Sequence, residues 1–162
     1  MADVSFDEWV LALHVLSAFA YVAGLVLFWV LIYAVRRADT PEETIRLEPV
    51  VKVGNAAIGI GAGGTIILGI WLAFSYGDYD IWDAWIIAAL VLWVLAAAVG
   101  SRTGAAYMQG MNKAQELQSA GQAGANAELL ALNRTRSGLV MHALASLIVV
   151  VILVDMIWKP GA

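Results

Sequence analysis

The chain has 162 residues, of which 62% are hydrophobic and only 14% are charged, and its formal net charge is -4. Soluble domains carry roughly 25% charged residues, so this composition indicates a protein surrounded by lipid rather than by water. The negative charge excludes nucleic acid as a partner, because nucleic-acid binding needs a basic face. The absence of cysteine excludes disulfides, iron–sulfur clusters and thiolate zinc sites.

Four apolar stretches lie at about residues 9–35, 50–74, 82–100 and 139–158. Each has about the 20 residues that cross a bilayer as an α-helix. The residues before the first stretch are acidic, whereas a cleavable signal peptide begins with a basic segment, so we expect this stretch to be retained. The sequence therefore predicts an all-α membrane protein, a single transmembrane domain over residues 1–162 that folds as a bundle of four transmembrane helices.

The basic residues predict the orientation of this bundle. All but one of them lie in the first and third connections: Arg36, Arg37, Arg46 and Lys52, then Arg102, Lys113, Arg134 and Arg136. The positive-inside rule places both connections in the cytoplasm, so both termini and the short loop 75–81 face outward from a bacterial inner membrane. Aromatic residues, which prefer the membrane interface, agree with this orientation. We expect an outer belt of Trp9, Tyr76, Tyr79, Trp82, Trp85 and Trp158, and an inner pair of Trp29 and Tyr33.

The first connection contains a helix-start signal. Thr40 precedes Pro41 and two glutamates, which supplies a capping hydroxyl, a proline at the first position and acids in the first turn. We expect a short surface helix over residues 41–48, with Pro49 at the beginning of the second apolar stretch.

The second stretch is rich in glycine. Small residues recur at every fourth position of one face, and a GxxxG pair lies beside them: Ala57, Gly61, Thr65 and Gly69, with Gly59 and Gly63. A phosphate-binding loop is excluded, because such a loop needs a strand before it. Small faces let helices pack closely within a bundle or a dimer, which is the interpretation that we favour. The alternative is a smooth face against a flat cofactor such as a porphyrin.

The third connection, residues 101–136, is longer. It predicts two helical arms that turn at Gly121 to Gly124, with Asn126 as the cap of the returning arm. A cytoplasmic helical hairpin would then extend helices three and four. Its apolar residues fit ordinary helix packing, which we favour over a docking surface for a partner.

His14 and His142 are the only histidines, and each lies inside an apolar stretch. Ionisable side chains in a membrane are costly, so each is a candidate functional residue. Both share a helix face with small or weakly polar residues, so we expect both to point into the bundle. The alternatives are a neutral packing residue, hydrogen-bonded to a carbonyl or a hydroxyl such as Ser17 or Ser146, and a proton relay.

The two histidines differ in depth. A helix rises about 1.5 Å per residue, so His14 lies roughly 8 Å below the outer aromatic belt and His142 roughly 24 Å below it. This separation is too large for both to ligate one metal or haem iron within a chain. In a twofold homodimer, each histidine would instead meet its own copy at the same depth. Within one chain, Tyr21 and, more weakly, Met156 are the further candidates near His14.

Residues 13–25, LHVLSAFAYVAGL, carry a histidine followed by an aromatic residue, a small residue and glycine. This segment resembles the first span of copper-resistance-protein-D-like proteins. It also resembles the first span of an uncharacterised bacterial family of predicted integral membrane proteins that is allied to them. The segment Gly69-Ile70-Trp71-Leu72 and the polar hairpin are also similar to this uncharacterised family. The resemblance covers nearly the whole chain in layout and implies that His14 is a metal or haem ligand.

Two related classes fit less well. Four-helix membrane protoporphyrinogen oxidases begin with a similar histidine, but this chain has Arg36-Arg37-Ala38-Asp39 where they have a basic-aromatic-histidine ending, and it has no lysine in its third span. Di-haem b-type membrane cytochromes need four histidines, and this chain has two.

The leading hypothesis is an integral membrane protein that binds haem b or copper, with a redox or metal-handling role. His14 is the preferred ligand, His142 forms a second metal or cofactor site, and Tyr21 is a further cofactor-binding candidate. Histidine serves both haem and copper, so both stay open. The alternatives are a cofactor-free accessory subunit of a membrane complex and a small transporter. The expected partners are the lipid bilayer and a second copy or other membrane subunits.

Overall fold

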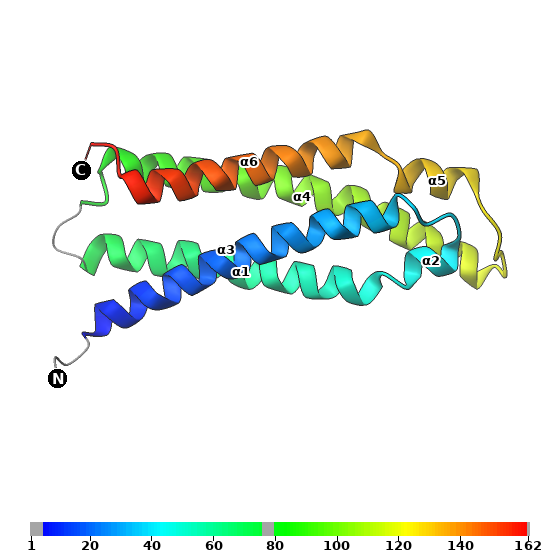
Figure 1. The fold of residues 1–162 in the computed structure, drawn as a ribbon, viewed down its shortest axis with the longest axis horizontal. Coiled ribbons are helices and arrows are strands. Elements are labelled where there is room, and N and C mark those ends of the chain that lie inside the picture. Colours follow the sequence, from blue (N-terminus) through cyan, green and yellow to red (C-terminus); the bar gives the residue numbers. More distant parts are fainter. Residues whose placement is uncertain (1–4, 76–79, 162) are drawn as a thin grey trace.

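The computed structural model describes residues 5–75 and 80–161. Within these residues the chain forms six helices, four of them long and antiparallel (Figure 1): α1 (Phe6–Val35), α2 (Pro41–Ile45), α3 (Glu48–Ser75), α4 (Ala84–Ser119), α5 (Ala127–Asn133) and α6 (Arg136–Trp158). The first residues of α1 and the last residues of α6 lie at the same end, and α2 and α5 lie at the other, called the α2–α5 end below.

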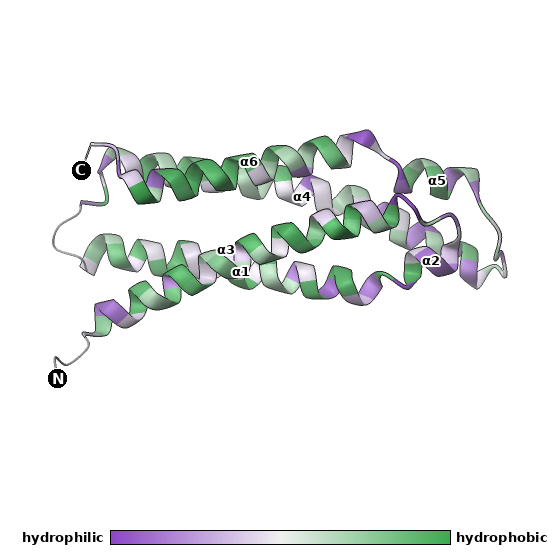
Figure 2. Ribbon diagram, in the orientation of Figure 1, coloured by the Kyte–Doolittle hydropathy of each residue, from purple (hydrophilic) through white to green (hydrophobic). Residues whose placement is uncertain are grey.

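The four long helices are apolar over most of their length, and polar residues gather toward the α2–α5 end (Figure 2). In the described part of the chain, four helical segments are long and apolar enough to cross a membrane. Their outward faces carry large apolar side chains, such as Phe19 and Ile60, which is 71% exposed. Water would not tolerate so continuous an apolar surface, whereas lipid does. The prediction of an all-helical bundle with four candidate spans is confirmed.

The first arm of the predicted hairpin is present. The third apolar stretch ends near residue 100, and α4 continues beyond it to Ser119. Its last part keeps one face buried at helical spacing, through Thr103, Tyr107, Met111 and Ala114. No proline interrupts this segment, so the helix continues after its apolar stretch ends. It stops just before Gly121, which has φ +73 and so allows the predicted turn.

The long helices associate in two pairs. α1 packs along α3, α4 packs along α6, and contacts between the pairs are few. The α1–α3 pair is close because glycine replaces a side chain at the crossing points: a Cβ at Gly24 would lie 2.7 Å from Ile58, and one at Gly61 would meet the backbone of Tyr21. The small face of the second stretch thus packs within the chain, as favoured from the sequence.

The short helices form by local capping. Thr40 and Glu43 make a complete capping box at the start of α2, in which the backbone N–H of Asp39 also donates to the Glu43 carboxylate at 2.8 Å. These backbone donors lower the pKa of Glu43 below its usual value. Asn126 caps α5 as predicted. The helix predicted over residues 41–48 was too long, since α2 ends at Ile45. Proline is tolerated only in the first turn of a helix, so Pro49 requires a new helix, and α3 begins at Glu48.

α5 folds back along α4. Ala114, Leu117 and Leu129 form a small buried cluster between these helices. Lys113 of α4 forms an ion pair with Glu128 of α5 at 2.9 Å. Hydrogen bonds from Lys113 to Glu128 and then Glu116 raise the pKa of the lysine.

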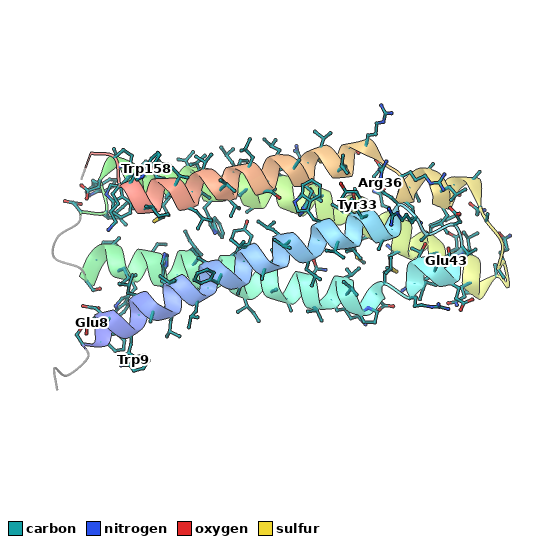
Figure 3. The ribbon with its side chains drawn as sticks, in the orientation of Figure 1. Glu8, Trp9, Tyr33, Arg36, Glu43 and Trp158 are labelled. Carbon is teal, nitrogen blue, oxygen red and sulfur yellow. The ribbon has the colours of Figure 1, made fainter. Side chains whose placement is uncertain are left out.

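The aromatic belt is confirmed only in part. Trp9 and Trp158 are exposed near one end of the bundle, and Tyr33 is exposed near Arg36 toward the other (Figure 3). Trp82 is also exposed, whereas Tyr76 and Tyr79 lie outside the described residues. Trp85 is 7% exposed and packs with Ala73 and Ile86, because its position on α4 faces the neighbouring helices. Trp29, expected at the inner interface, contacts α6 through a hydrogen bond from its indole N–H to the Ser146 hydroxyl.

Candidate intramembrane ligand site

His142 is the most buried ionisable side chain in the apolar part of the bundle. It is 3% exposed, and its Nε2 lies 3.1 Å from the backbone carbonyl oxygen of Leu25 on α1. A carbonyl only accepts hydrogen bonds, so Nε2 is the donor and carries the proton of the neutral ring. Nδ1 then keeps its lone pair, which is the requirement for a metal ligand.

Aromatic rings from α1 hold this imidazole in place. The Trp29 ring lies edge-on to it with centroids 4.9 Å apart, and the Phe28 centroid is 6.0 Å away. The Trp29 indole N–H also donates to the Ser146 hydroxyl at 3.2 Å. His142 and Ser146 of α6 thus connect α6 to α1, beside the buried clusters in which Tyr107, Ala96 and Val149 also pack on α1.

Of the partners considered for a neutral histidine, a carbonyl on a neighbouring helix is the one found for His142, whereas the candidate hydroxyls of Ser17 and Ser146 bond elsewhere. The Ser146 hydroxyl donates to the backbone carbonyl of His142, not to its ring, at 2.8 Å. The Ser17 hydroxyl likewise donates to the carbonyl of Leu13 at 2.8 Å. In a helix, the carbonyl one turn earlier is always within reach of a serine, and this local bond competes with bonds to other side chains.

A cavity of about 470 Å³ separates the two helix pairs beside His142. Its aromatic lining comes from Tyr21, Phe28 and Trp93. The rest of its wall consists mostly of small residues of α3 and α4: Gly59, Ala62, Gly63, Ala96, Ala97, Gly100 and Gly104. At Gly59, Gly63, Gly100 and Gly104, an added Cβ would meet nothing within 4 Å in the described structure. The GxxxG pair of the second stretch therefore faces this cavity, while its neighbour Gly61 packs on α1.

His14 lies elsewhere. Its ring contacts Gly69 of α3, where an added Cβ would be 2.9 Å from Cε1. Its Nδ1 is buried without a hydrogen-bond partner among the described residues. His14 precedes Leu25, the partner of His142, by eleven residues of α1, or roughly 16 Å along the helix. The two histidines thus occupy separate places in the structure, and Tyr21 lines the cavity of His142.

The arrangement favours some ligands over others. Within residues 5–75 and 80–161, no group of three or more histidine, cysteine, aspartate or glutamate side chains could hold a metal ion. Met156, the less favoured candidate for a second ligand beside His14, packs against the cluster of Ala73, Trp85 and Ile86. What the site offers is one imidazole with a free lone pair, aromatic rings and a smooth wall of small side chains.

These features define an integral membrane protein with four candidate spans and a cavity between two helix pairs. The family model described as "Predicted integral membrane protein (DUF2269)" matches residues 8–160, and the chain belongs to this family. This agrees with the uncharacterised membrane family that the first span and the overall layout resembled. No curated protein and no solved structure matches the chain. The link to copper-resistance protein D stays a prediction.

Proposed function

We propose that this protein binds haem b within the membrane, in the cavity between the helix pairs, with His142 as an axial ligand. The observation that carries the proposal is the place of His142, which is 3% exposed and lines a cavity of about 470 Å³. One nitrogen of its ring forms no hydrogen bond to a described residue. Pockets for small ligands commonly measure roughly 300–1,000 Å³ and are mostly apolar, as this one is.

The surroundings of His142 suit iron ligation. Ligating histidines usually donate their other ring N–H to a carbonyl or carboxylate, which fixes the tautomer and the ring orientation. The Leu25 carbonyl has this role here, through Nε2 at 3.1 Å. The glycines and alanines of α3 and α4, together with Tyr21 and Trp93, would line the site that holds a flat macrocycle.

Haem is favoured over copper by the number of ligands that each needs from the protein. A porphyrin supplies four nitrogens to its iron, so one or two protein ligands are sufficient. A protein-bound copper ion draws its ligands from side chains, commonly two histidines and a cysteine. The described residues bring no such group together. When bound, haem would supply one-electron redox chemistry, and the protein would set its potential through the axial ligand and burial.

We further propose that the α2–α5 end faces the cytoplasm. Arg37, Arg102 and Arg136 are exposed at or near this end, as the positive-inside rule requires. Both termini, at the opposite end, would then face outward, and α5 with the end of α4 would form a cytoplasmic hairpin. A homodimer in which two copies meet through their lipid-facing surfaces is compatible with this arrangement.

The visible absorption spectrum of the purified protein tests the haem proposal. We expect a Soret band in the wild type and in His14→Ala, and its loss in His142→Gln. Glutamine can still donate to the Leu25 carbonyl, so this variant removes the imidazole while preserving the link between the helix pairs. Circular dichroism checks that both variants remain helical.

Two outcomes would contradict the proposal. A band lost in His14→Ala and kept in His142→Gln would move the site to His14, whose unpartnered Nδ1 makes it the second candidate. A folded protein without any visible band, even when produced with haem supplied in excess, would favour a cofactor-free accessory subunit or a transporter.

A further inference from the structure

Two polar groups near the α2–α5 end are buried without a hydrogen-bond partner in the described structure: the hydroxyl of Tyr107 and Oδ1 of Asn133. Asn133 is 1% exposed, and its amide nitrogen donates to the Thr44 hydroxyl at 2.9 Å. Buried acceptors and hydroxyls are satisfied by protein groups or by ordered water in nearly all proteins. Ordered water is therefore the expected partner of these two atoms.

The space for water is present. Tyr107, Asn133 and Thr44 line a small cavity of about 20 Å³. One water molecule needs roughly 10–15 Å³ of such volume and two to four polar partners. Gly110 keeps the space beside the asparagine clear, since a Cβ there would lie 2.9 Å from Oδ1.

This small cavity adjoins the large one. Phe28, Asn55 and Gly104 line both of them. In the large cavity, the indole N–H of Trp93 is also buried without a described partner. Trp93 precedes Tyr107 by fourteen residues of α4, which is roughly 21 Å along the helix. Unpartnered polar groups therefore occur beside both cavities, which share part of their lining.

We propose that ordered water occupies the small cavity and continues past Asn55 and Gly104 into the large cavity as far as Trp93. The route connects the α2–α5 end with the apolar middle of the bundle and exchanges water and protons between them. The route describes the chain without haem, which would displace this water from the large cavity, and it rests on the polar groups of the chain alone.

Exchange of the Trp93 indole hydrogen with deuterated water tests this route. The resonance is assigned by its loss in Trp93→Phe, and the protein is studied in micelles in a preparation without visible absorption. We expect exchange to be several-fold slower in Gly104→Leu, because the leucine side chain enters the junction of the two cavities, where space for a Cβ is open. Ala105→Leu, the same change on the exposed neighbouring position, is the control and should leave the rate unchanged.

Tyr107→Phe provides a second variant that removes a single oxygen atom. It should also slow the exchange of Trp93, because the first water loses a partner. The indole resonance of Trp29, bonded to Ser146, reports whether either variant disturbs the fold. The proposal is overturned if the Trp93 hydrogen in the wild type exchanges as slowly as buried helix amides, or if both variants leave its rate unchanged while the fold is intact. A haem band at His142 would be unaffected by that result.

Discussion

Gly61→Ala is the sharpest test of the contact between α1 and α3. The added methyl would lie 2.6 Å from the Cα of Tyr21 and 2.8 Å from the carbonyl oxygen of Ser17. The backbone nitrogen of Tyr21 lies closer still, and ordinary contact begins at 3.4 Å, so α1 must retreat by more than about 0.8 Å. The obstacle is backbone, which cannot turn aside as a side chain does. Overpacking of this kind costs about 1–3 kcal/mol.

Gly59→Ala is the matched control, since a Cβ there meets nothing within 4 Å in the described structure. Both variants gain the same helix propensity over glycine, about 1 kcal/mol, so the difference between them isolates the packing cost. Unfolding in detergent, followed by tryptophan fluorescence, should show Gly61→Ala less stable than Gly59→Ala by about 1–3 kcal/mol. Equal stability of the two variants would refute the close approach of α1 and α3 at this position.

Two further predictions concern the α2–α5 end. Glu43→Gln should lower the unfolding temperature near neutral pH and have no effect in acid. Folding lowers the pKa of Glu43, so the ionised carboxylate stabilises the protein at pH values above the pKa of the unfolded chain. This stabilisation is lost as the pH falls through the pKa of the folded protein. An equal effect of the substitution at both pH values would contradict this reasoning. Asn133→Leu should destabilise the protein by about 1–3 kcal/mol, because it removes the bond to Thr44 and leaves that buried group with fewer partners. The exposed Asn112→Leu is its control, and a comparable loss in both variants would show that burial of Asn133 is not the cause.

The helices were predictable because their signals are local. A run of apolar residues defines each span, Thr40 and Asn126 cap the short helices, and Gly121 ends α4. Helix α4 was expected to continue past its apolar stretch as the first arm of the hairpin, because hydropathy reports where the apolar surface stops and not where the helix stops. Residues 101–119 are more polar than the apolar stretch before them, yet they keep a buried face against the short helices and remain helical.

Partners across the bundle were not predictable, because they depend on which helices pair. Sequence spacing shows that Trp29 and Trp85 lie near the ends of apolar stretches, which is also where interfacial anchors lie. It does not show that Trp29 faces α6 and Trp85 faces α3 and α6. The same holds for the glycines of α3: Gly61 and Gly63 are two residues apart, but one packs on α1 and the other lines the cavity.

The packing of the helices changes which histidine is the preferred candidate ligand. His14 was preferred because of its small helix face and its resemblance to a known first span, and both of these are properties of α1 alone. A ligand site, however, needs space, and space in this bundle arises where the α1–α3 pair meets the α4–α6 pair. His14 lies inside one pair, against Gly69, whereas His142 reaches from one pair to the other and lines the cavity between them. A ligand between the pairs would therefore bind next to His142, and variants of His142 that lose its bond to the Leu25 carbonyl, rather than variants of His14, should alter how the two halves of the bundle hold together.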